Sequence, residues 1–145
     1  MNVIRKINVR CQSVIEELDE FGICCDSDKT ETLSNGVLTL EDGGVVLSYT
    51  EDSEGGRINS RVEIKDGAVA VKKTGAVECD FRFFGGGEHA SLYGVPPYKF
   101  DVVIKTKRIS CDMGEDGGSV LLNYRMTIGG ADKNVRMKIL AEVVK

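Results

Sequence analysis

The sequence predicts an all-β protein, a single antiparallel up-and-down β-barrel of about 8–10 strands. Seven or more short segments alternate apolar and polar residues with a period of two, which is typical of strands that bury one face. Asp-Gly, Gly-Gly and Glu-Asp-Gly-Gly occupy nearly every gap, so tight turns reverse the chain. Closure removes the exposed edges of so many strands, although two packed sheets remain the structural alternative.

The composition indicates one soluble domain over residues 1–145. Hydrophobic residues make up 41% and charged residues 29%, which excludes disorder, and no apolar run approaches the roughly 20 residues of a membrane helix. A chain of 145 residues buries enough surface for one core without disulfides. Residues 1–10 lack the pattern of a secretory signal, so we expect a cytoplasmic protein whose five cysteines remain thiols.

The charge pattern disfavours two classes of partner. The formal net charge is −4, and the 19 basic residues are mostly spread along the chain. Only Lys105–Arg108 is a dense basic run, which on a strand is typical of a solvated face. We therefore expect neither nucleic acid nor a membrane surface as a partner.

The amino-terminal quarter contains one clear strand and one ambiguous segment. Val3–Cys11 alternates, with Ile7 and Val9 on one face and Lys6 opposite. In the next segment, Gln12–Asp28, apolar residues at helix-like spacing stand among acidic ones. A short helical turn and an acidic excursion from the barrel rim are both compatible with it.

Two hairpins follow. Lys29–Glu41 and Val45–Glu51 are predicted strands joined by a turn at Asp42-Gly43-Gly44. Residues 57–65 and 68–73 form the next pair. The Asp66-Gly67 turn between them is the strongest hairpin signal in the chain.

The carboxyl-terminal half contains the most regular strands. Ala76–Phe84 alternates and ends at three consecutive glycines, which suit a flexible tip. In Tyr98–Met113 the apolar parity changes, which predicts a β-bulge or a break near Lys105–Arg108. Val120–Ile128 and Val135–Val143 alternate cleanly and close the barrel.

One stretch resembles a known family. Residues 83–100, which read Phe-Phe-Gly-Gly-Gly-Glu-His-Ala-Ser-Leu-Tyr-Gly-Val-Pro-Pro-Tyr-Lys-Phe, are similar to the pattern of the YwiB-like family of small bacterial proteins. Shorter matches extend the resemblance from about Gly36 to the carboxyl end. The resemblance implies a calycin-like, lipocalin-shaped barrel and no particular activity. The family pattern reads Thr-Pro-Tyr-Gly after the tyrosine, and of these only Pro96 is retained in Val95–Tyr98.

The residues offer little recognisable chemistry. His89 is the only histidine, which excludes histidine-based metal clusters, and Cys24-Cys25 lacks the spacing of redox and zinc motifs. The acidic turns lack the ligand pattern of a calcium loop, and the glycine triplet lacks the lysine and helix of a phosphate loop. We therefore expect no metal and no cofactor. For His89, a hydrogen bond to a loop backbone is favoured over a role as a general base with Tyr93.

Two charges break the apolar faces of their strands. Glu51 continues the parity of Val45 and Leu47, and Lys73 continues that of Val69 and Val71. A charge that faces inward is costly unless it is paired or hydrated.

We therefore predict a binding site at one open end of the barrel. It would gather Glu51, Lys73, His89 and Tyr93, with Pro96 in the neighbouring loop.

The function expected from these features is binding rather than catalysis. A small barrel either fills itself with side chains or holds one small ligand. The first hypothesis is therefore a non-catalytic barrel that binds a small apolar or amphipathic molecule. The alternatives are an enzyme that uses His89 and Tyr93 at the mouth, and a protein-interaction module, including a homodimer, that uses Val46–Thr50 or the Pro96-Pro97 loop.

Overall fold

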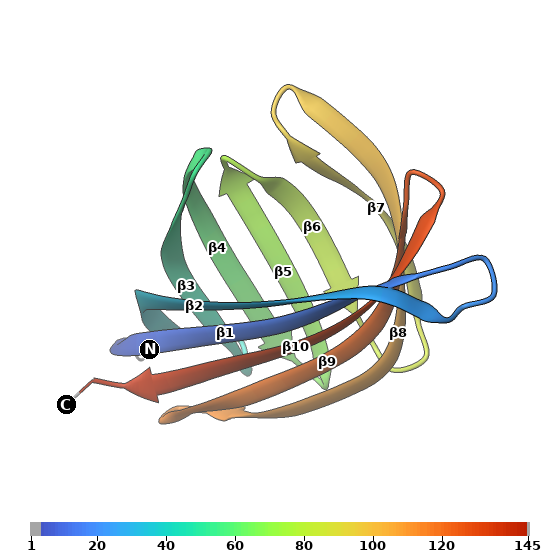
Figure 1. The fold of residues 1–145 in the computed structure, drawn as a ribbon. Helices are drawn as coiled ribbons and strands as arrows, with labels where there is room; N and C mark the ends of the chain where they lie inside the picture. Colours follow the sequence, from blue (N-terminus) through green and yellow to red (C-terminus); the bar gives the residue numbers. More distant parts are fainter. Residues whose placement is uncertain (1–3, 145) are drawn as a thin grey trace.

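The computed structural model describes residues 4–144, which form ten β-strands (Figure 1). Every strand pairs antiparallel with its neighbours in sequence, as the short turns between the segments require. The strands are β1 (Ile4–Leu18), β2 (Cys24–Glu41), β3 (Gly44–Ser53), β4 (Gly56–Lys65), β5 (Ala68–Gly75), β6 (Glu78–Phe83), β7 (Glu88–Val95), β8 (Tyr98–Gly114), β9 (Gly117–Ile128) and β10 (Ala131–Val143).

The sheet closes on itself through its first and last strands. β1 pairs with β10 from Ile7 opposite Val143 to Leu18 opposite Asp132, and the ten strands form one closed barrel. The predicted all-β, up-and-down barrel is thus confirmed, and two packed sheets are excluded as its architecture. No helix in residues 4–144 is long and apolar enough to cross a lipid bilayer.

The Asp-Gly signals mark the turns that they predicted. Asp42 and Asp66 have φ angles of 47° and 53°, and Gly43 and Gly67 follow them at 79° and 76°. Positive φ at both central residues matches the right-handed twist of the flanking strands in a two-residue hairpin. These turns fix the registers of β2 against β3 and of β4 against β5.

The predicted irregularity in the long strand is confirmed. The register of β8 against β9 shifts between Thr106 and Arg108, so Lys107 is the extra residue of a bulge. The bulge moves the apolar set from even-numbered Val102 and Ile104 to odd-numbered Ile109 while keeping all of them on the inner face.

The ambiguous segment Gln12–Asp28 contains no helical turn, and the acidic end of the β1–β2 hairpin, exposed over residues 20–31, projects from the barrel (Figure 1). β1 continues through it to Leu18, turns, and returns as β2 from Cys24. The strand conformation prevails because β1 pairs on both sides here, with β10 and with β2. Ladder hydrogen bonds to two neighbours override a helix-like spacing of apolar residues.

Side chains fill the barrel below its rim. The core is one contiguous cluster contributed by all strands except β7, and aromatic rings span it. The Phe83 and Tyr124 rings lie 4.7 Å apart between centroids, although their strands are not neighbours. A small barrel is either filled by its own side chains or holds a ligand, and below the rim this barrel is filled by side chains. The largest fully buried side chains are Phe83, Ile7, Leu38, Leu47, Ile104, Ile139, Val9, Val62, Val69, Val102, Val120 and Val135.

Replacing Gly36 by Ala should destabilise the barrel where β2 leaves β3. A Cβ at position 36 would collide with the Ser48 carbonyl oxygen and lie 2.8 Å from the Tyr49 Cβ. We expect a loss of about 1–3 kcal/mol in the free energy of unfolding, measured by urea denaturation. Gly85→Ala is the control, because nothing lies within 4 Å of its added Cβ. Equal stabilities of the two variants would contradict the close approach at Gly36.

Candidate functional site

A row of inward-facing side chains crosses the wall from β3 to β8 and is polar in its middle. Its members are direct cross-strand partners, so their side chains lie on one face and in contact range. The row begins at buried Tyr49 and ends at Phe100, which is 50% exposed. The members in order are Tyr49, Ser60, Lys73, Cys79, Tyr93 and Phe100.

Glu51 and Lys73 form an ion pair at this row. Their Oε1 and Nζ atoms lie 3.5 Å apart, and only 11% of the glutamate and 22% of the lysine side chain are exposed. The Ser60 hydroxyl donates a hydrogen bond of 3.2 Å to the same carboxylate oxygen. The inward charges are thus paired and hydrogen bonded, the condition under which such burial is tolerated.

Two thiols and two tyrosine hydroxyls at or near the row are held in their neutral forms. Burial raises the pKa of the Cys79 thiol from 9.0 to about 11, against the opposing effect of the Lys73 ammonium. Burial likewise raises the pKa of Cys11 and of the Tyr49 and Tyr124 hydroxyls. At neutral pH the thiols are therefore poor nucleophiles and act as small, weakly polar side chains.

The wall is interrupted between β6 and β7. The two strands pair only at Glu78 with Gly94 and at Cys79 with Tyr93. Beyond them, side chains of β7 replace the backbone ladder: the Ser91 hydroxyl donates to the Asp80 carbonyl at 2.7 Å, and His89 Nε2 lies 3.3 Å from the same oxygen. Figure 1 shows β7 and the start of β8 standing apart from β6 at the top of the barrel.

This interruption opens the seam groove, a hollow of about 590 Å³. Residues of both sheet faces line it, so the groove cuts into the wall instead of lying on its surface. Lys73 and Cys79 lie at positions of their strands that face the barrel interior, and Leu92 and Lys99 lie at positions that face outward. The full lining is Lys72, Lys73, Thr74, Glu78, Cys79, Asp80, His89, Ala90, Ser91, Leu92, Gly94 and Lys99.

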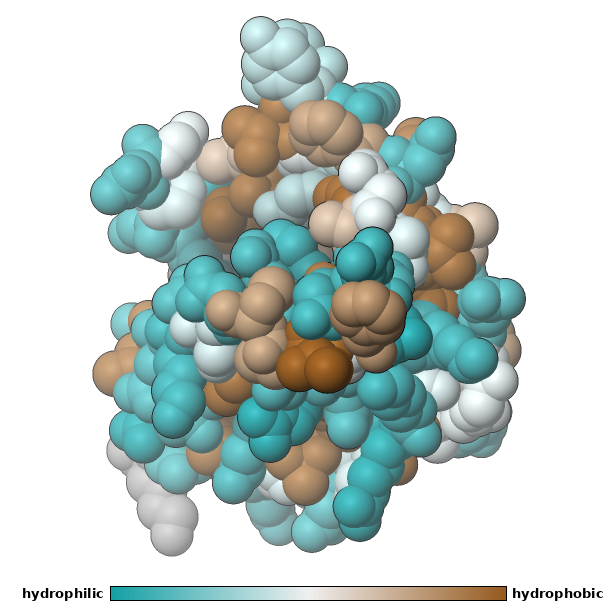
Figure 2. All heavy atoms as spheres, turned by 45° about the vertical axis from the view of Figure 1, so that its right-hand side comes forward, coloured by the Kyte–Doolittle hydropathy of each residue, from teal (hydrophilic) through white to brown (hydrophobic). Residues whose placement is uncertain are grey.

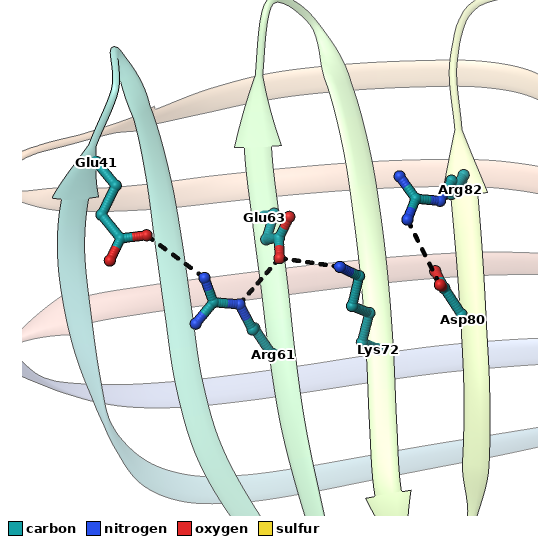
Figure 3. Close-up of polar contacts among 6 residues, drawn as sticks. All are labelled: Glu41, Arg61, Glu63, Lys72, Asp80 and Arg82. Carbon is teal, nitrogen blue, oxygen red and sulfur yellow. Dashed lines mark hydrogen bonds and ion pairs between the residues drawn. The ribbon is translucent and has the colours of Figure 1, made fainter.

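The lysines of the groove differ in their partners. Lys72 ends a chain of outer-wall contacts and lies 3.3 Å from Glu63, which also accepts from Arg61 at 2.9 Å (Figure 3). Lys73 is paired with Glu51 inside the barrel. Within residues 4–144, Lys99 has no ion-pair partner, so it is the cation of the groove that is free to meet an anion.

The hairpin beside the groove exposes apolar side chains on its inner face. Val95, Tyr98 and Phe100 share this face with Tyr93, yet all three are about half exposed or more. Figure 2 shows apolar side chains just below the topmost point of the molecule, where Figure 1 places the end of this hairpin. The hairpin extends past the rim, so the core does not cover its inner face.

The predicted site residues are only partly brought together. Glu51 pairs with Lys73, and Lys73 and His89 line the same groove. Tyr93 stacks on Phe81 with ring centroids 6.2 Å apart. Pro96 lies in the exposed β7–β8 turn and is not part of the groove lining.

His89 contacts the backbone of strand β6, whereas the sequence predicted a hydrogen bond to a loop backbone. Its hydrogen bond goes to a backbone carbonyl, and among residues 4–144 no carboxylate, hydroxyl or thiol hydrogen bonds to the imidazole. The described residues also hold no group of three or more His, Cys, Asp and Glu side chains arranged for a metal ion.

Sequence reasoning did not identify Cys79, Ser91 or Lys99 as groove residues. The composition of β7 did hint at a groove. This strand has few large apolar residues, too few to build a buried face. The break in the ladder itself depends on where β6 and β7 diverge, which no local pattern encodes.

Comparison with known proteins places the chain in a family. Residues 22–139 match the family described as "Domain of unknown function (DUF1934)". The chain belongs to this family. A similar protein is the "Uncharacterized beta-barrel protein YwiB" of Bacillus subtilis (strain 168), which is 26% identical over 129 residues, 89% of this chain and 87% of the relative.

The fold agrees with an experimental structure of similar sequence. The crystal structure of the ywiB protein from Bacillus subtilis superposes with a TM-score of 0.85 over 98% of this chain and 94% of that one, at 26% identity. This chain and the Bacillus subtilis protein thus share the barrel, and the description of the family assigns no activity. The function has to be argued from the geometry of the row and the seam groove.

Lys73→Met should destabilise the barrel more than the double variant Glu51→Gln/Lys73→Met. The single change leaves a largely buried carboxylate unpaired, which costs about 1–3 kcal/mol. The double change removes both charges and should recover most of that loss. Urea denaturation at pH 7 measures both. Additive effects in the double-mutant cycle would show that the two charges do not interact.

The stability of the wild-type protein should fall as the pH rises from about 9 to 11. Cys79 ionises near 9.0 when unfolded and near 11 when folded, so its contribution is complete below the lower value and lost through the higher one. Cys79→Ala should make the decline shallower by up to about 1.4 kcal/mol per pH unit. Urea denaturation across this range measures it. Equal slopes would contradict burial of the Cys79 thiol.

Proposed function

We propose that the protein binds a small amphipathic molecule with an acidic group in the seam groove, without transforming it. The single observation that carries this proposal is the interrupted β6–β7 ladder, which opens a groove of about 590 Å³ from the surface to the inward-facing row. That volume lies within the range of small-molecule sites in proteins.

The lining of the groove matches a ligand with two unlike ends. Leu92 and Ala90 of β7 supply apolar surface, and Cys79 continues it inward as an uncharged thiol. Lys99 supplies a cation without a competing carboxylate partner in residues 4–144. Ser91 adds a hydroxyl near the centre of the groove, although it already donates to Asp80. An acidic headgroup at Lys99 and an apolar body along Leu92 fit these contacts.

The filled interior supports a ligand site in the wall over one in a lumen. Phe81 and Phe83 of β6 point inward and pack with Tyr93 and Tyr124, so little space remains behind the groove. The ligand would thus be short or would leave its tail at the exposed inner face of the β7–β8 hairpin. Catalysis is disfavoured because His89 is engaged with a backbone carbonyl and the thiols are protonated.

Dodecanoate should bind the wild-type protein more tightly than dodecyltrimethylammonium, which has the same chain with a cationic head. Lys99→Gln should lower the affinity for dodecanoate by about fivefold, because an exposed charge pair contributes about 1 kcal/mol to binding. Isothermal titration calorimetry measures the affinities. Lys65→Gln, which removes an exposed lysine outside the groove, is the control. Equal binding of the two amphiphiles, or equal effects of the two variants, would contradict the proposed site.

Native mass spectrometry of protein purified from cells then identifies the natural ligand. A co-purifying acidic amphiphile that is retained by Lys65→Gln and lost from Lys99→Gln supports the proposal. Protein that carries no small molecule and binds neither probe would overturn it.

A further inference from the structure

The first two thirds of β2 have a free backbone edge. β2 pairs with β1 from Leu18 opposite Cys24 to Ile4 opposite Thr39, but with β3 only over residues 36–41. Within the described residues, Cys24–Asn35 therefore has a strand on one side and none on the other. In an antiparallel strand alternate residues point their N–H and C=O groups to that side, so the free edge presents regularly spaced donors and acceptors.

This edge is open because neither face of the segment belongs to the core. Residues 24–31 are all exposed. The side chains with inward parity are polar, among them Thr30, Thr32 and Ser34. This part of the strand is thus held by its hydrogen bonds to β1 alone, and solvent has access to the other edge.

The segment around the edge is strongly acidic. Residues 16–31 contain seven carboxylates and one lysine, Lys29. Basic residues of β10 neutralise two of the carboxylates, since Arg136 lies 3.5 Å from Glu16 and Lys133 lies 3.8 Å from Glu17. Glu20, Asp26, Asp28 and Glu31 have no ion-pair partner in residues 4–144.

Charge decides which strand can occupy this edge. Two copies of the protein joined edge to edge would bring the same unpaired carboxylates together, which is unfavourable by like-charge repulsion. A basic strand would instead place ammonium or guanidinium groups among them. The turn next to the edge also exposes Phe21 and Ile23, at 79% and 63%, which would receive an apolar side chain of the partner. Figure 2 shows apolar side chains grouped on the face that carries this hairpin end.

We propose that Cys24–Asn35 of β2 binds an extended basic polypeptide segment by strand addition. Backbone hydrogen bonds would contribute affinity whatever the side chains of the partner, and the carboxylates would select for lysine and arginine. The proposal concerns a different part of the barrel from the seam groove and does not depend on the proposed small-molecule function.

The test uses a fluorescent peptide of alternating Lys and Thr, about ten residues long, which spans the edge at about 3.4 Å per residue. Fluorescence anisotropy should show binding that weakens with salt, and a peptide with Glu in place of Lys should bind at least about tenfold more weakly. Hydrogen exchange should slow at alternate amides of Cys24–Asn35. A Lys-Thr peptide N-methylated at every residue should lose affinity, because neither of its edges can donate a backbone hydrogen bond.

Charge variants provide the matched control. Asp26→Asn/Asp28→Asn/Glu31→Gln should lower the affinity for the Lys-Thr peptide at least about tenfold. Glu88→Gln/Asp112→Asn/Asp116→Asn removes an equal number of exposed carboxylates that lie outside this segment. This variant should bind the Lys-Thr peptide with unchanged affinity.

Four outcomes would overturn the proposal. They are absence of binding by the Lys-Thr peptide, slowed amide exchange only outside Cys24–Asn35, equal effects of the two triple variants on peptide affinity, and dimerisation of the free protein through this edge. Because the unfolded protein would also lack the barrel's slow-exchanging core amides, the same exchange data report whether each variant is folded.

Discussion

The pairing of β1 with β10 is the interaction on which the barrel depends. These strands are far apart in sequence, and their ladder runs from Ile7–Val143 to Leu18–Asp132. Without it the sheet would keep two long free edges, and its apolar face would have nothing to pack against. Closure turns one face of all ten strands into a single interior, which the rings of Phe83 and Tyr124 help to fill. The cost is loop-closure entropy for nearly the whole chain, so this ladder is expected to form late in folding.

Closure is incomplete at two places on opposite sides of the barrel, and both candidate sites lie there. β2 and β7 are five positions apart in the cyclic strand order in either direction. β2 leaves β3 beyond Gly36, whose missing side chain permits the last close approach, and β7 leaves β6 beyond Cys79. The first gap exposes a polar, acidic edge, and the second exposes Lys99, thiol and apolar side chains. β2 keeps a full ladder with β1, and β7 keeps one with β8, so each gap leaves only one edge of its strand unpaired.

Period-two alternation was sufficient to predict an antiparallel all-β fold, the hairpin turns and an irregularity near Lys107, because these depend on local parity or turn chemistry. It left two packed sheets as the alternative to a barrel, which the pairing of β1 with β10 excludes. It was insufficient for Gln12–Asp28, where pairing with β10 overrides the local spacing. The same limit applies to the site. The parity of Glu51 and Lys73 predicted that they face inward, and they do pair. The seam groove was not predictable, because the divergence of β6 and β7 is a property of the whole sheet.

The Glu51–Lys73 pair shows why the upper interior differs from the lower one. A buried pair of charges gives little net stability, and apolar residues of similar size at the same positions would serve the core equally well or better. Lys73 of this pair belongs to the row that reaches the seam groove and also forms part of the groove lining. Its physical consequence is a neutral yet strongly polar layer between the packed core and the opening. Such a layer prevents the apolar core from extending to the groove, so the groove can admit water or a polar group without disrupting the packing beneath it.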